Sequence, residues 1–328
     1  MKAVAVLACA LGFYVWGCIY LPAEQLRAEI RQRTTNEFAE ATFFKPTESK
    51  TNDLASSLAP LILQEVNGGN ERLPRLDRFG TLSLSNGVLV LDSSHPAIYW
   101  QAESVQLRQR PHMRLSYLWC YALPPADKYR GADLRPAGAE TSGFVRPSEE
   151  AHPKGAITAR PPVSPTGLPL QGIRITLNSA GQPVIWEVLA DGSTAEVIYV
   201  SQNLEVAAVN EFGEALPGRR YAVERSLEEA PDVIVARIMD DGPVVMGPII
   251  YLSARTRDVT TLTCRCMPAQ AKRLLDTSVY DLLPFQDVAA QSLLTQARVL
   301  AREQTAFWPG DQPSGNELEK RLRLPSGF

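Results

Sequence analysis

The stretch GIRITLNSAGQPVIWEVLADGSTAEVIYV, from Gly172 to Val200, decides the class of fold that we expect. It contains three runs of apolar and β-branched residues, and the breaks between them, 178–183 and 191–192, are rich in turn-forming residues. Such residues fit a pleated sheet, and short runs separated by turns are typical of antiparallel strands. The segment therefore predicts three consecutive strands.

Further strands are predicted before this segment, over residues 79–123. GTLSLSNGVLVLD alternates leucine with serine and then turns at Asn86-Gly87, a strong signal for a two-residue hairpin. AIYWQAESVQLRQ and MRLSYLWCYAL follow as two more strands. In the second of these, Tyr117, Trp119 and Tyr121 share one face because strand side chains alternate. The residues between them are also apolar, which predicts a central strand covered on both sides.

The other elements are predicted from caps and prolines. Helices are expected at 23–41 and at 52–66, the second capped by Asn52 or Asp53 and kinked or divided by Pro60. Ser201 and Gly213 mark the two ends of another helix. Two strands are predicted within 232–252, joined at 240–243, and another strand at 258–266. Helices are predicted to open at Pro268 and Pro284 and to run to about Leu283 and about Trp308.

These elements predict an α+β protein of mostly antiparallel β modules, with a helical N-terminal stalk and C-terminal helices. Nine prolines between Pro124 and Pro169 exclude a regular helix or sheet there, which indicates a long loop or a linker. The expected parts are a membrane anchor or uncleaved signal (1–23), a helical stalk (24–67), a β module (79–123), the Pro-rich loop or linker (124–171) and an α+β module (172–328).

The N-terminal segment predicts where the protein lies. Nineteen uncharged residues separate Lys2 from Pro22, enough to cross a hydrocarbon core of about 30 Å at about 1.5 Å per residue. We therefore expect residues 3–21 to contact the membrane and the rest of the chain to lie outside the cytoplasm, in the cell envelope. A secreted protein is the alternative. The net charge of -3 argues against a nucleic-acid partner, because nucleic-acid binding depends on clustered Lys and Arg.

The two cysteines of LTCRCMP, Cys264 and Cys266, lie two positions apart in a predicted strand, so their thiols should face the same side. That arrangement suits a soft metal, although a structural zinc site needs four ligands and no second pair is present. A disulfide between Cys120 and one of the pair is another possibility. Buried, unreactive structural thiols are the preferred interpretation.

Two further groups of residues could form a site. The acids Glu187, Glu224, Asp240, Asp241 and Asp258 could supply a carboxylate pair for hydrolysis of a glycan or a peptide, although Asp240-Asp241-Gly242 is more simply explained as a hairpin turn. The aromatic residues Tyr117, Trp119 and Tyr121, with Tyr99 and Trp100 nearby, could form a platform that binds a ligand. Core packing is the alternative and the preferred explanation.

The sequence lacks the phosphate-binding, nucleophile-elbow, zinc-protease and EF-hand motifs that identify common classes of protein. We therefore expect a non-catalytic binding or structural role at a cell surface of the bacterial type, with a protein or a glycan as partner. A carboxylate hydrolase and a thiol or metal-binding protein stay open as alternatives. The sequence specifies neither the ligand nor any cofactor.

Overall fold

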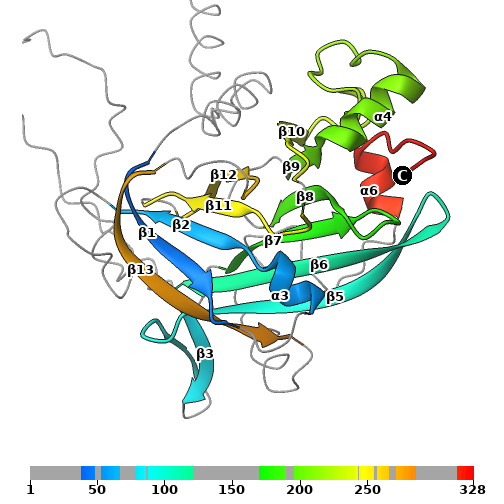
Figure 1. Cartoon of the computed structure of the whole chain (residues 1–328). Coiled ribbons are helices and arrows are strands. Elements are labelled where there is room, and N and C mark those ends of the chain that lie inside the picture. Colours follow the sequence, from blue (N-terminus) through cyan, green and yellow to red (C-terminus); the bar gives the residue numbers. More distant parts are fainter. Residues whose placement is uncertain are drawn as a thin grey trace, which may run out of the picture.

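The structure is a computed structural model that describes residues 38–48, 53–66, 78–85, 88–121, 170–189, 196–242, 244–254, 257–265, 271–285 and 316–328. Within these residues the protein is mostly β, with 55% of residues in strands and 12% in helices. The strands form one nearly closed, barrel-like sheet (Figure 1).

The sheet contains strands from all parts of the described chain. They are β1 (Phe38–Pro46), β2 (Leu61–Glu65), β3 (Phe79–Ser85), β4 (Val88–Asp92), β5 (Ala97–Leu107), β6 (Arg110–Tyr121), β7 (Leu170–Leu177), β8 (Pro183–Leu189), β9 (Glu196–Ser201), β10 (Val233–Met239), β11 (Ile249–Leu252), β12 (Val259–Thr263) and β13 (Ala271–Pro284). Their order in the sheet is β10-β9-β8-β7-β6-β5-β13-β1-β2-β11-β12. The β3–β4 hairpin branches from this path through the pairing of β3 with β6.

The antiparallel strands predicted from local sequence are present. β7, β8 and β9 are the three strands of Gly172–Val200, and β6 joins them on the other side of β7. β3 pairs with β4 in the register Ser85↔Val88, as the predicted two-residue hairpin requires. The β5–β6 hairpin turns at Arg108 and Gln109, which both have positive φ, a backbone twist that suits a tight hairpin.

The helix predicted after β9 is also confirmed. In α4 (Gln202–Phe212) the backbone N–H of Leu204 donates to the Ser201 hydroxyl over 3.2 Å, and Gly213 ends the helix with φ of 81°. This helix connects β9 to β10, which pair in parallel, because a parallel pair needs a crossover rather than a tight turn. The other helices in the described part of the chain are α3 (Leu54–Leu58) and α6 (Asn316–Arg321).

The prediction of an α+β fold with a helical stalk and C-terminal helices is wrong. Residues 38–46, which the prediction placed in the helical stalk with 38–41 inside its first helix, form β1, and the helix capped by Asp53 ends at Leu58, after which β2 begins beyond Pro60. Residues 271–284, predicted as a helix, form β13, which pairs in parallel with β1 and with β5. Pairing between segments more than 180 residues apart in the sequence overrides their local helical propensity.

The connection between β10 and β11 is not the hairpin turn predicted for 240–243. β10 lies at one end of the strand order and β11 lies near the other end. The segment between β10 and β11 therefore crosses from one end of the sheet to the other. None of the described helices is long and apolar enough to span a membrane. The predicted anchor, 1–23, and most of the Pro-rich segment lie outside the described residues, as does the helix expected from Pro284 to about Trp308 except for its first two residues, of which Pro284 ends β13.

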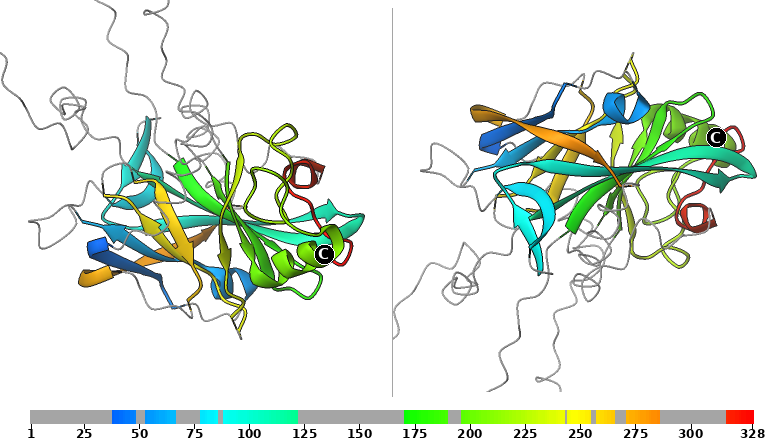
Figure 2. Two further views of the ribbon diagram at one scale, coloured as in Figure 1. Left: turned by 90° about the horizontal axis from the view of Figure 1, so that it is seen from above. Right: turned by 90° about the horizontal axis from the view of Figure 1, so that it is seen from below.

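The two faces of the sheet bury different cores. The inner face carries the largest cluster of apolar side chains, contributed by β1 to β3, β5 to β13 and α3. On the outer face, α4 and α6 cover a second cluster formed by β5, β8, β9 and β10. Seen from above and below, these two helices lie at one end of the long β5–β6 hairpin, and β1, β2 and β13 lie at the other end (Figure 2). The segment between β10 and β11 lies where the two ends of the sheet path approach each other.

Candidate functional site

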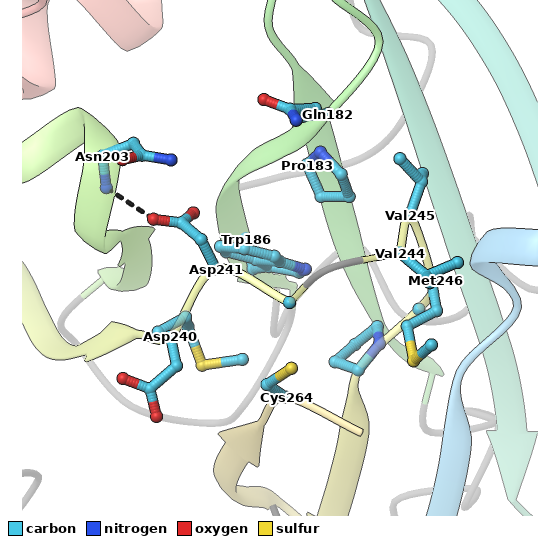
Figure 3. Close-up of a pocket in the computed structure, with 14 residues that line it drawn as sticks. Gln182, Pro183, Trp186, Asn203, Asp240, Asp241, Val244, Val245, Met246 and Cys264 are labelled. Atoms are coloured by element: carbon cyan, nitrogen blue, oxygen red, sulfur yellow. Dashed lines mark hydrogen bonds between the residues drawn. The ribbon is translucent and has the colours of Figure 1, made fainter. Parts of the chain in front are cut away.

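A pocket of about 580 Å³, including its open mouth, lies beside the β10–β11 segment (Figure 3). We call it the seam pocket because its lining comes from both ends of the sheet path. The residues that line it are Gln182, Pro183, Trp186, Asn203, Met239, Asp240, Asp241, Gly242, Val244, Val245, Met246, Gly247, Pro248 and Cys264. The enclosed volume is about 70 Å³, below the range of about 300–1,000 Å³ that is typical of pockets for whole ligands, so the pocket has room to enclose only part of a ligand.

The β10–β11 segment is held against α3 and β2 by backbone contacts. The N–H of Gly247 donates to the carbonyl of Ser57 over 3.2 Å, and the N–H of Leu61 donates to the carbonyl of Pro248 over 2.9 Å. A Cβ at position 247 would overlap the Leu58 carbonyl, so the close approach requires glycine. The segment is thereby fixed at its C-terminal end, directly after the residues that line the pocket.

Aliphatic side chains of this segment are exposed beside the pocket. Val244 is 61% exposed and Val245 is 37% exposed, and both lie on the side of the pocket opposite Asp241 (Figure 3). Turns that connect strands are ordinarily rich in polar residues, so two adjacent exposed valines are unusual in this connection. They give the pocket one apolar wall that faces solvent.

The opposite wall is acidic. The N–H of Asn203, in the first turn of α4, donates to Asp241 Oδ2 over 2.8 Å, so Asp241 fixes the start of the helix against the β10–β11 segment. Burial raises the pKa of Asp241, and the neighbouring charge of Asp240 raises it further, although the Asn203 hydrogen bond opposes both effects. Asp240 and Asp241, which are adjacent in the sequence, both line the pocket, but their carboxylates point to different sides, that of Asp241 toward Asn203 and that of Asp240 away from it (Figure 3).

Trp186 lies between the two walls, with its ring nitrogen on the side of Val244 and Met246 (Figure 3). The residue is 6% exposed, and its Nε1–H has no hydrogen-bond partner in the described part of the chain. An unsatisfied buried donor costs about 1–3 kcal/mol, so the indole N–H would be stabilised by an acceptor in the pocket. Trp186, Val244 and Val245 were not among the residues proposed from sequence, although two valines inside a turn-rich connection were a visible signal.

The cysteine pair is only partly described. Cys264 follows the end of β12, is half-buried and lines the seam pocket, while Cys266 lies outside the described residues. Cys120 is a free thiol, fully buried on the outer face of β6, and burial raises its pKa. No group of three or more metal-ligating side chains occurs among the residues that the structure describes.

The other predicted acids lie apart and have structural contacts. Glu224 accepts hydrogen bonds from the N–H groups of Arg220 and Tyr221 over 2.8 and 3.0 Å. Asp258 accepts a hydrogen bond from Gln171 over 3.2 Å. Glu187 is buried in an ion network on the outer face of the sheet. Of the five acids proposed from sequence, the structure brings only Asp240 and Asp241 to the same pocket.

The network around Glu187 is here called the charged layer and comprises Glu103, Arg114, Arg174, Glu187, Glu196 and Arg321. Glu187 Oε1 lies 3.5 Å from Arg174 Nη1 and 3.5 Å from Arg321 Nη1, which links β7 and β8 to α6. The side chains of Arg174 and Glu187 are 0% and 1% exposed. Such complete burial points to a structural role, because no ligand can reach these two charges from solvent.

The aromatic residues proposed as a platform are inside the molecule. Tyr117, Trp119 and Tyr121 are all 0% exposed and belong to the inner apolar cluster. The hydroxyl of Tyr117 donates to the carbonyl of Ala55 over 2.8 Å, which ties β6 to α3. Tyr99 is buried on the opposite face. These side chains fill the core and offer no surface to a ligand in this conformation.

No family model, no curated protein and no solved structure matches this chain.

Proposed function

We propose that the protein is a non-catalytic binding protein of the cell envelope, held at the membrane by residues 3–21, and that its ligand binds in the seam pocket. The observation that carries the proposal is the composition of this pocket. Exposed Val244 and Val245 line one side of the pocket and Asp240 and Asp241 line the other, and between them lies an almost buried tryptophan whose ring N–H has no acceptor among the described residues. Apolar walls with a few convergent polar groups are typical of binding sites.

The positions of the chemically reactive groups favour binding over catalysis. A hydrolase of the kind considered from sequence needs two carboxylates that flank a substrate, with one of them acting as an acid. Asp241 is already engaged at the start of α4, and Glu187, Glu224 and Asp258 have structural partners elsewhere.

Histidine, the usual proton-transfer group, does not line the pocket in the described part of the chain. His95 lies in an exposed turn at 2.7 Å from Asp92, and His112 is buried and stacks on Phe328. Cys264 therefore has no described histidine beside it to act as a base, which argues against a thiol mechanism.

The binding role is tested by site-specific photo-crosslinking in the native cells. A benzophenone amino acid replaces Val244, and the matched control carries it at Val206 on α4, which is 45% exposed but lies outside the pocket. We expect defined crosslinked products from position 244 and not from position 206. Equal products from both positions, or none above background at 244, would contradict the proposal.

The location is tested separately. Val206→Cys places a thiol on an exposed helix face, and a membrane-impermeant maleimide is added to intact cells. We expect this variant to be labelled above the level of the unaltered chain, and deletion of residues 1–23 to release the protein from the membrane fraction. Labelling that appears only after the cells are lysed would show that the body of the protein is cytoplasmic.

A further inference from the structure

The seam pocket has a marked imbalance of charge. Its described lining contains two carboxylates, Asp240 and Asp241, and contains no lysine, arginine or histidine. A site of this kind repels anionic ligands and attracts cations. Because burial disfavours the charged form of Asp241 and Asp240 repels it, a bound cation would stabilise the charged form of Asp241. The ligand is therefore expected to carry a positive charge toward this wall.

The opposite wall requires an apolar group close to that charge. Val244 and Val245 are exposed, Met246 lies beside Val244, and Pro183 lies between the indole and Val245, which continues the apolar surface (Figure 3). Covering the two valines removes apolar surface from water, which is favourable. A small inorganic cation would leave this wall uncovered, so the ligand has aliphatic groups as well.

The indole of Trp186 adds a third requirement, independent of charge. Its N–H is an obligatory donor, is more than nine-tenths buried and has no described acceptor, and it lies on the side of the pocket near Val244. An acceptor such as a carbonyl oxygen would complete it. The face of the indole also favours a nearby cation.

We infer that the ligand of the seam pocket is a short peptide segment with a lysine or arginine side chain directed to Asp241, aliphatic neighbours against Val244 and Val245, and a backbone carbonyl that accepts from Trp186. A peptide supplies the cation, the aliphatic groups and the carbonyl within a few bonds of one another. This inference rests on the proposed binding function, because it names the ligand class of the same site.

The test measures fluorescence anisotropy with the full-length protein in detergent micelles. The probes are two pools of fluorescein-labelled pentapeptide amides, randomised over Ala, Val, Leu and Gly except for a central Lys in one pool and a central Glu in the other. We expect saturable binding of the Lys pool and at least tenfold weaker binding of the Glu pool. High salt should weaken binding of the Lys pool, since exposed charges are screened.

Three variants connect the result to the pocket. Asp241→Asn removes the charge but retains an oxygen that accepts from Asn203, so the start of α4 is preserved while binding of the Lys pool falls at least tenfold. Trp186→Phe removes the donor and retains a ring, and it should weaken binding several-fold. Val206→Ser alters an equally accessible valine outside the pocket and should leave binding unchanged.

The outcomes separate the ligand class from the function. If both pools bind equally and Asp241→Asn has no effect, the inferred cationic peptide is wrong. If neither pool binds although position 244 still crosslinks to a partner in cells, the ligand class is wrong and the binding function stands. If peptides fail to bind and crosslinking at 244 fails as well, both proposals are wrong.

Discussion

Replacement of Glu187 by glutamine should destabilise the protein strongly, because it leaves Arg174 buried without its nearest negative charge. The two side chains lie 3.5 Å apart and are 1% and 0% exposed. Two unit charges at that distance interact by about 5 kcal/mol at an effective dielectric constant of about 20. Burial already lowers the pKa of Arg174, which shows that its charge is costly at this position. Breaking a buried pair by removing one partner costs about 3–5 kcal/mol, and we expect Glu187→Gln to fall in that range.

The measurement is urea denaturation at pH 7.5, followed by near-UV circular dichroism. Glu229→Gln is the matched control, because Glu229 pairs with Arg225 over 3.6 Å on the surface and its removal should cost less than about 1 kcal/mol. Arg174→Met combined with Glu187→Gln should recover much of the loss, since no charge of the pair then stays buried without its partner. A loss from Glu187→Gln as small as that from Glu229→Gln, or a double variant no more stable than the single one, would refute this reasoning.

Three other predictions concern different parts of the molecule. Burial and the charge of Glu187 raise the pKa of Glu196 from its ordinary 4.5 to about 7, so the folded state binds a proton that the unfolded chain has released. The free energy of unfolding should therefore fall as the pH rises from about 4.5 to about 7, and urea titrations across that range should show a smaller fall for Glu196→Gln. Cys120 should resist an aromatic disulfide reagent until the protein unfolds, because it is fully buried and its pKa is raised; rapid labelling of the native protein at this position would contradict that. Gly247→Ala should lower the thermal midpoint, with a loss of about 1–3 kcal/mol, because its Cβ would overlap the Leu58 carbonyl; an unchanged midpoint would show that the segment can shift at no cost.

The candidate site could be predicted only in part from the sequence. Asp240, Asp241 and Cys264 were singled out by residue type, and the structure places all three at the seam pocket. Trp186 was not recognised, since a tryptophan in a predicted strand gives no sign of which cavity it faces. Its meeting with Val244 depends on a connection that crosses from one end of the sheet path to the other, and no local pattern encodes that path.

The sequence by itself determined the elements whose signals are local. The strands of Gly172–Val200, the β3–β4 hairpin and the capped helix α4 all depend on contacts between segments that are neighbours in the sequence, where side-chain alternation, turn residues and caps act directly. Whether residues 38–46 and 271–284 form helices or strands was decided only by the tertiary structure. Each segment has helix-forming residues, yet the two pair as β1 and β13 from opposite ends of the described chain. Their backbone groups gain hydrogen bonds and a buried face only when the partner strand is present, so the choice between helix and strand is made by assembly of the sheet and not by either segment alone.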